Sequence, residues 1–243
     1  MELKIYPDYA HLSRAAADLI SEVISKKKNA LVCIASGHTP IGVFECLVKD
    51  IKSGKLDITG CTFLSLDEWV GIDPEDPGSC LSMLKRDFFD QVPIKDNQIV
   101  AFNVKANLEK ECKRINDLIA SNEGLDVMLV GLGTNGHIGM NEPGTSFELY
   151  AHVGELAEET KTVGQKYFTK ATSLSNGVTL GLKHLKEAKL PIVMANGEKK
   201  STIIKQILTT SPTEQIPATI NHSIPQGYIM VDELAAAQWK KSN

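Results

Sequence analysis

Short apolar runs and helix-periodic segments alternate along this chain of 243 residues. The runs are continuous rather than alternating, as in strands that are buried on both faces of a sheet. Such alternation predicts an α/β fold, with a three-layer, doubly wound, mostly parallel sheet and helices on both faces. The expected strands are 30–35, 61–66, 99–102, 125–130, 191–195 and 228–231. The expected helices are 9–26, 40–53, one ending near 89, 107–120, 198–209 and a short C-terminal helix.

Composition narrows the class of protein. Hydrophobic residues make up 42% and charged residues 23% of the chain, which is typical of a globular protein, and we expect a single domain over 1–243. The net charge of −4 and the lack of a basic block argue against a nucleic-acid partner. No apolar run could span a membrane and the N-terminus lacks a signal-peptide pattern, so a cytoplasmic location without membrane contact is expected.

Cysteine usage predicts neither a disulfide framework nor a zinc knuckle. The cysteines are odd in number, scattered, and form no C-x-x-C pair. They are expected to be free thiols in a reducing compartment. They are Cys33, Cys46, Cys61, Cys80 and Cys112.

Polar residues follow the first two long apolar runs. Because ligands of open α/β sheets bind beyond the carboxyl ends of the strands, these positions are candidate site residues. Residues 36–39 (Ser-Gly-His-Thr) join a strand to a helix, where hydroxyls and free amides suit a phosphate, although a simple capping turn fits as well. Asp67 and Glu68 follow the second run. One of them could serve as a general base, and the alternative is a capping or solvated acidic turn.

The segment 131–144 is the richest in glycine and carries a histidine. Glycines stand at 131, 133, 136 and 139, which indicates close approach of the backbone to another group. His137, with Asn135 and Glu142 near it, could form an acid–base unit, whereas a purely structural histidine is the alternative. The context of a dinucleotide-binding loop is missing, and no second histidine stands at metal-ligand spacing.

Lys199 opens a helix after the strand 191–195. A lysine there opposes the helix dipole and so favours an anionic ligand, although a solvated lysine is the alternative. Residues 144–177 are polar, irregular and punctuated by glycine. We interpret them as a mobile lid over the site, against the alternative of an ordinary surface excursion.

Three of these segments together resemble the amino-sugar-6-phosphate deaminase/isomerase family, whose best-known members are the glucosamine-6-phosphate deaminases. They are 36–40 (Ser-Gly-His-Thr-Pro), 66–71 (Leu-Asp-Glu-Trp-Val-Gly) and 131–143, which ends in Asn-Glu-Pro. The resemblance runs in order from about residue 10 to about 232. Asp67-Glu-Trp-Val, Gly78-Ser-Cys80 and 177–182 are most similar to the galactosamine-6-phosphate isomerase branch.

The resemblance implies a cofactor-independent reaction on a hexosamine 6-phosphate. The ring opens, a proton moves from C2 to C1, and ammonia is lost as the keto-hexose 6-phosphate forms. It implies that Asp67 is the C2 base, that His137 assists ring opening, and that Glu142 and Asn135 orient His137. It further implies a small-molecule partner and leaves room for a homo-oligomer. The implied substrate- and phosphate-binding residues are Ser36, Gly37, His38, Thr39, Gly136, Lys166 and Lys199.

Three positions depart from the family pattern. Asn135 stands where the best-known members have Asp, which leaves Glu142 as the charged partner of His137. Lys166 aligns with a phosphate-binding Arg and offers a point charge instead of a bidentate fork. His38 replaces a usual Gly, and it either contacts the phosphate or points to solvent.

The sequence is also compatible with two other functions. A 6-phosphogluconolactonase shares the expected fold and the Gly-His segment, but it needs activated water rather than a C2 base. A non-catalytic sugar-phosphate sensor is expected to carry a DNA-binding module, and the stretch before residue 30 fits one amphipathic helix rather than a helix-turn-helix.

Overall fold

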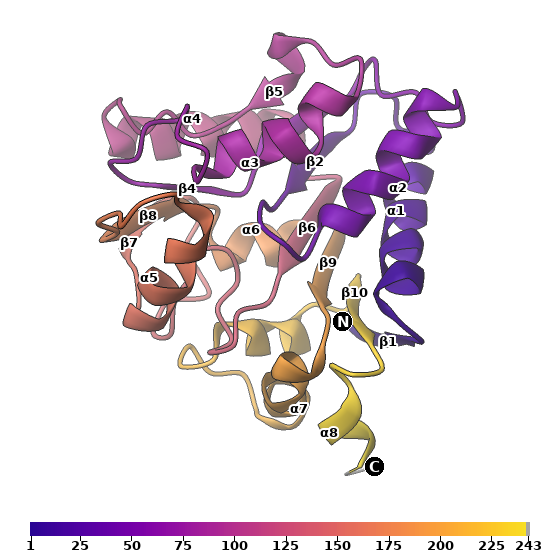
Figure 1. Ribbon diagram of the computed structural model, residues 1–243, viewed down its shortest axis with the longest axis vertical. Coiled ribbons are helices and arrows are strands. Elements are labelled where there is room, and N and C mark those ends of the chain that lie inside the picture. Colours follow the sequence, from indigo (N-terminus) through magenta and orange to yellow (C-terminus); the bar gives the residue numbers. More distant parts are fainter. Residues whose placement is uncertain (242–243) are drawn as a thin grey trace.

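A seven-stranded parallel sheet forms the centre of the computed structural model, which describes residues 1–241 (Figure 1). The strand order is β1-β10-β9-β6-β2-β3-β5, and every neighbouring pair is parallel. The expected mostly parallel sheet is therefore confirmed. The strands are β1 (Glu2–Tyr6), β2 (Leu31–Ile34), β3 (Thr62–Ser65), β5 (Ile99–Val100), β6 (Val127–Gly131), β9 (Leu190–Ala195) and β10 (Tyr228–Asp232).

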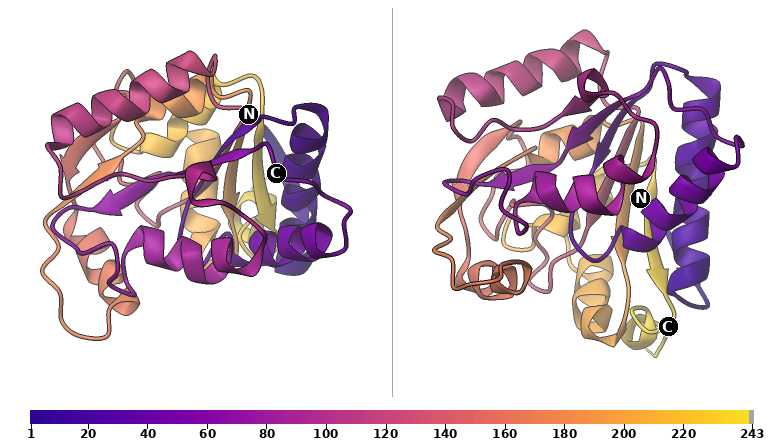
Figure 2. Two further views of the ribbon diagram at one scale, coloured as in Figure 1. Left: turned by 90° about the horizontal axis from the view of Figure 1, so that it is seen from above. Right: turned by 45° about the horizontal axis from the view of Figure 1, so that its top comes forward.

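Helices cover both faces of this sheet, as Figures 1 and 2 show. The helices are α1 (Tyr9–Lys26), α2 (Ile41–Lys52), α3 (Cys80–Asp87), α4 (Leu108–Ser121), α5 (Glu158–Gly164), α6 (Leu182–Glu187), α7 (Ser201–Thr209) and α8 (Ala237–Lys240). Alternate residues of β6 pack into different clusters: Val127 and Leu129 pack with α1, α2 and α3, whereas Met128 and Val130 pack with α4, α6 and α7. The strands read as continuous apolar runs because both faces are buried.

The first strand lies at the N-terminus, and the expectation that strands begin near residue 30 was wrong. β1 pairs in parallel with β10 along its whole length, from Glu2 opposite Tyr228 to Tyr6 opposite Asp232. β1 is an edge strand and only partly buried, so its sequence mixes charged and apolar residues. It lacks the continuous apolar run by which the inner strands were recognised.

The segment 144–177 is not irregular, and that prediction was also wrong. It holds β7 (His152–Glu155), α5, the 3-10 turn η3 (Gln165–Tyr167) and the start of β8 (Asn176–Thr179). Both strands join β4 (Asp67–Trp69) in a small antiparallel sheet of order β4-β8-β7. β7 alternates between half-buried and exposed residues, and glycine stands opposite glycine at 154 and 177. These features hide a strand from analysis of hydrophobicity.

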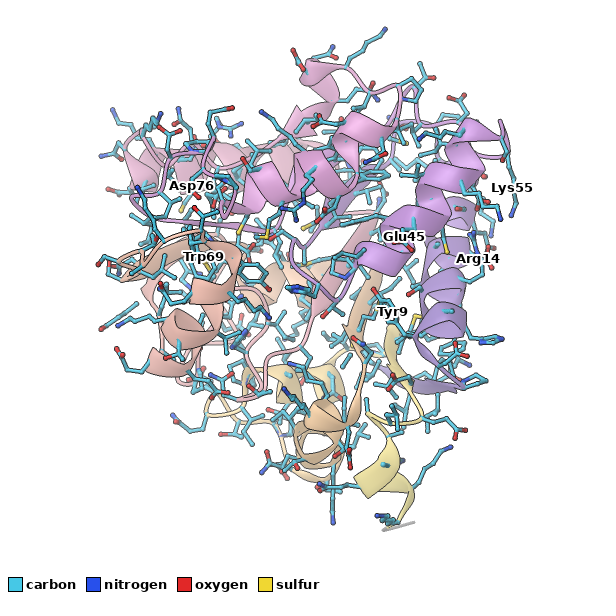
Figure 3. All side chains as sticks on the ribbon, viewed as in Figure 1. Tyr9, Arg14, Glu45, Lys55, Trp69 and Asp76 are labelled. Carbon is cyan, nitrogen blue, oxygen red and sulfur yellow. The ribbon has the colours of Figure 1, made fainter. Side chains whose placement is uncertain are left out.

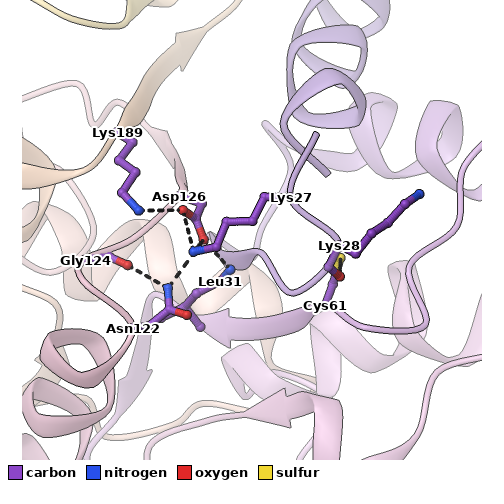
Figure 4. Close-up of polar contacts among 8 residues, drawn as sticks. All are labelled: Lys27, Lys28, Leu31, Cys61, Asn122, Gly124, Asp126 and Lys189. Carbon is purple, nitrogen blue, oxygen red and sulfur yellow. Dashed lines mark hydrogen bonds and ion pairs between the residues drawn. The ribbon is translucent and has the colours of Figure 1, made fainter. Parts of the chain in front are cut away.

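The amino ends of the central strands meet at a buried carboxylate (Figure 4). Asp126, just before β6, accepts hydrogen bonds from Lys27 Nζ at 2.7 Å, Lys189 Nζ at 2.9 Å and the Leu31 N–H at 2.8 Å. Asn122 adds a longer contact of 3.4 Å. This network joins the ends of α1, β2, β6 and β9. At the opposite end, the carboxyl ends of these strands border a cavity.

Candidate active site

A cavity of about 580 Å³ opens at the carboxyl ends of the central strands. Its walls come from the segments after β2, β3, β6 and β9, together with α5 and η3, which connect β7 to β8 of the small antiparallel sheet. This is the edge at which ligands bind in open α/β sheets. The expected residues Ser36, Gly37, His38, Thr39, Asp67, His137, Lys166 and Lys199 all line this cavity.

The turn after β2 presents residues 36–39 to the cavity. Gly37 has a φ of 86°, which the tight turn requires. Tyr9 of α1, labelled in Figure 3, holds the turn. Its hydroxyl donates to the Thr39 carbonyl at 2.9 Å and accepts from the Gly42 backbone N–H at 2.8 Å. In the described chain the N-cap of α2 is Pro40, without a side-chain cap bond. The hydroxyls of this turn therefore do not cap α2.

Asp67 and Glu68 diverge, as expected for successive residues of a strand. Glu68 accepts the N–H groups of Cys80 and Leu81, each at 2.9 Å, and so caps the start of α3. Asp67 is buried and lines the cavity. Burial raises the pKa of Asp67 to about 7, the negative charge of Glu68 adds to the rise, and a hydrogen bond with the Cys80 thiol opposes it.

The ring of His137 also lines the cavity, with its Nδ1 3.6 Å from Glu142 Oε2. Asn135 contacts both residues. Its side-chain amide donates to the same Oε2 at 3.2 Å, and its side-chain oxygen accepts the backbone N–H of His137 at 3.0 Å. Burial lowers the pKa of His137, while the Glu142 charge opposes that effect. Glycine is required at 133, because a Cβ there would lie 2.4 Å from the ring.

The base candidate and the histidine segment lie against each other. A Cβ at Gly139, two residues after His137, would lie 3.3 Å from Asp67 Oδ2. Glu142 Oε1 is buried without a hydrogen-bond partner among the described residues. Glu142 and Asn135 stand behind His137 rather than on the cavity wall. Gly136 is also set back, where it packs against Ile216.

Three lysines converge on the cavity: Lys166 of η3, and Lys199 and Lys200 of the turn η4 (Glu198–Lys200). Burial lowers the pKa of Lys166, and the charge of Lys199 adds to this. Burial lowers the pKa of Lys200 as well, with a further contribution from Lys166. Positive charges that disfavour one another in a cavity are suited to an anionic ligand.

His38 neither points simply into solvent nor stands alone. Its ring is exposed but stacks on Tyr167 of η3, with centroids 5.4 Å apart and an interplanar angle of 29°. Burial and the nearby charge of Lys166 lower the pKa of His38. His38, which stands where the family usually has Gly, therefore joins the turn after β2 to η3.

Sequence reasoning missed several residues of the cavity. The sequence analysis selected Lys199 but not its neighbour Lys200, although both belong to the segment 196–200. Glu159, Thr160 and Tyr167 belong to the segment that was expected to be irregular, so no signal pointed to them. Thr160 lies beside His137, with its Oγ1 3.3 Å from Nδ1.

Residues 1–241 contain no group of three or more His, Cys, Asp or Glu side chains suited to hold a metal ion. Among those residues, no helix is both long and apolar enough to cross a membrane. All five cysteines are free thiols, as expected.

Known proteins of similar sequence share one family name. A sequence model described as glucosamine-6-phosphate isomerases/6-phosphogluconolactonase matches residues 8–227. A glucosamine-6-phosphate deaminase of Bacillus velezensis (strain FZB42) is 36% identical over 230 residues, which cover 94% of this chain and 95% of that protein. AgaI of Escherichia coli (strain K12), a protein named as a deaminase, is 34% identical over 212 residues, covering 87% and 84%.

A solved structure gives the same result at the level of the fold. The structure of a monomeric glucosamine-6-phosphate deaminase superposes with a TM-score of 0.94 at 30% identity, and the match covers 98% of this chain and 100% of that one. The match to the family model spans most of the sequence. The chain belongs to the glucosamine-6-phosphate isomerase/6-phosphogluconolactonase family.

Proposed function

We propose that this protein is an amino-sugar-6-phosphate deaminase/isomerase that converts glucosamine 6-phosphate or galactosamine 6-phosphate to the keto-hexose 6-phosphate and ammonia. One observation carries the proposal: a buried carboxylate with a raised pKa, Asp67, shares a cavity with His137 and three lysines. A base, an acid–base group and an anion site are the three parts that the reaction needs.

In this proposal, the reaction begins with ring opening. His137 takes the proton of the anomeric hydroxyl and returns a proton to the ring oxygen, which leaves an open-chain aldehyde. Glu142 lies 3.6 Å from the ring and is held by Asn135, so it stabilises the protonated imidazole. A ring that is buried and neutral at rest is ready to accept a proton.

Asp67 then removes the proton from C2 and delivers it to C1. In the same step the amine nitrogen gives up one proton and the C1 oxygen gains one, so that the C1 carbonyl becomes an alcohol and the C2 amine becomes an imine. Water adds to the imine at C2, ammonia leaves, and the ketone forms. A pKa near 7 suits this role, because a base is most effective when its pKa is close to the working pH.

The phosphate is assigned to the end of the cavity that the turn 36–39 and the lysines share. Ser36 and Thr39 offer hydroxyls, and Lys166 and Lys199 offer positive charge. These groups would hold substrate and transition state alike.

Residues 144–177 are proposed to act as the lid, since Thr160, Lys166 and Tyr167 from this segment line the cavity. Closure there would exclude water from the open-chain intermediate. A cytoplasmic location and a homo-oligomer stay predictions, and the matched solved deaminase is described as monomeric.

The decisive experiment measures ammonia release from glucosamine 6-phosphate and galactosamine 6-phosphate side by side, without added metal or nucleotide. Release from either supports the proposal, and the ratio of the two kcat/KM values identifies the epimer. Hydrolysis of 6-phosphogluconolactone is measured in parallel. Lactone hydrolysis without ammonia release would make the protein a lactonase, and binding without any turnover would make it a sensor.

A further inference from the structure

The hydroxyl of Thr160 reaches the histidine of the site from a different layer of the fold. Thr160 is only 7% exposed and lies on α5, which packs beside the small antiparallel sheet (Figure 1). Its Oγ1 lies 3.3 Å from Nδ1 of His137. The chemistry proposed above gives this contact no role.

The surroundings of Nδ1 decide which ring nitrogen carries the proton. Glu142 Oε2 lies 3.6 Å from the same Nδ1, and an ionised carboxylate can only accept a hydrogen bond. Because Asn135 donates to this oxygen, its position is set. A lone pair on Nδ1 would face a negative charge, whereas an Nδ1 proton meets two acceptors, the carboxylate and the hydroxyl. The contacts therefore favour the Nδ1–H form, which leaves the lone pair on Nε2.

A second contact holds α5 against the same segment. Glu159, next to Thr160, accepts a hydrogen bond from the hydroxyl of Thr134, three residues before His137. Both Glu159 and Thr160 lie at the cavity. Two consecutive residues of α5 thus contact side chains of the segment 134–137, and the contact of Glu159 helps to hold Thr160 beside the ring.

We propose that Thr160 is a positioning residue for His137: its hydroxyl accepts a hydrogen bond from the Nδ1–H group and fixes the ring so that Nε2 acts on the anomeric hydroxyl. This inference rests on the proposed function for its catalytic consequence. Its structural content, the tautomer and orientation of His137, is independent of that function. Thr160 contacts the ring rather than the reacting atoms, so it acts through His137 alone.

The test compares Thr160→Val, which keeps the shape and loses the hydroxyl, with Thr160→Ser, which keeps the hydroxyl. In the free protein, ¹⁵N NMR of the His137 ring is expected to show Nδ1–H in the wild type and in Thr160→Ser. In Thr160→Val the pKa of His137 should fall further, because the lost hydrogen bond is stronger from the protonated, charged ring than from the neutral ring. With substrate, Thr160→Val should lower kcat about tenfold, the effect of one hydrogen bond, with KM little changed.

Thr209→Val is the matched control, since Thr209 is an exposed helical threonine whose hydroxyl bonds to the Lys205 carbonyl away from the cavity. It should leave the ring spectrum and kcat unchanged. Thr160→Ala is the second variant if valine impairs folding. A wild-type ring protonated on Nε2, or a Thr160→Val ring with unaltered tautomer and pKa, would overturn the proposal. If the wild type releases no ammonia, the spectra still decide it, so the two failures are distinguishable.

Discussion

Each end of the central sheet holds an aspartate with little exposed surface, and the two differ in their partners. Asp126 at the amino end is 2% exposed, and Asp67 at the carboxyl end is 7% exposed. Burial acts to raise the pKa of both. At Asp126, hydrogen bonds from Lys27, Leu31 and Lys189 outweigh burial and lower the pKa, whereas the pKa of Asp67 rises to about 7. Cationic partners therefore mark the structural carboxylate, and their absence marks the candidate base.

The lysines at the two ends of the sheet also differ in their partners. Lys27 and Lys189 donate to Asp126, so charge is neutralised at the amino end. At the carboxyl end, Lys166 and Lys200 have lowered pKa values, first through burial and then through a neighbouring lysine. At the carboxyl end, Lys166 and Lys200 form no ion pair among the described residues, and Asp67 has no cationic partner there. The unpaired lysines have a cost in stability that an anionic ligand would offset.

Asp67→Asn is expected to have the largest effect on activity. Asparagine keeps the size of the side chain but cannot accept the C2 proton, so ammonia release should fall by about 10³-fold, within the range of general base catalysis. Substrate binding should be largely retained. The measurement is C2-proton exchange with solvent, together with kcat. Substantial residual exchange would remove Asp67 from the base role.

The same substitution should stabilise the fold. Because the folded pKa of about 7 exceeds the ordinary 3.8, the folded state holds a proton that the unfolded state releases between about pH 4 and pH 7. The stability of the wild type therefore falls as the pH rises through this window, by at most about 4 kcal/mol. Asp67→Asn lacks this loss. Its free energy of unfolding should exceed that of the wild type at pH 8 and match it near pH 4, and an equal difference at both values would contradict the raised pKa.

Asp126→Asn should do the opposite. An amide cannot balance the charges of Lys27 and Lys189, so the fold should lose about 3 kcal/mol at pH 7, the low end for a broken buried pair because both lysines are partly exposed. Since the folded pKa is lowered, the contribution of Asp126 is present above about pH 4 and is lost below it. Denaturant unfolding at pH 7 and pH 3 measures this. Asp18→Asn, an exposed control, should change little.

The contrast between the two aspartates also shows what a sequence can predict. The strands 61–66 and 125–130 were recognised because burial on both faces makes them continuously apolar, and their ends directed attention to Asp67 and His137. Asp126 was absorbed into its strand, because its partners Lys27 and Lys189 are far away in sequence. Thr160 was missed for the same reason. Its role depends on the pairing of β4, β8 and β7, which the local pattern does not reveal.

Lys199→Ala tests the lysines of the carboxyl end against those of the amino end. If Lys199 holds the phosphate equally well in the ground state and the transition state, its loss should raise KM about tenfold and leave kcat nearly unchanged. Lys189→Ala removes a lysine of equal charge from the other end of the sheet, where it contacts Asp126. It should lower stability slightly and leave KM unchanged. An unchanged KM in Lys199→Ala would place the phosphate elsewhere, whereas a raised KM in both variants would mean that KM reports the overall charge of the protein. Only a rise confined to Lys199→Ala supports the division of the sheet into a neutralised end and a ligand-binding end.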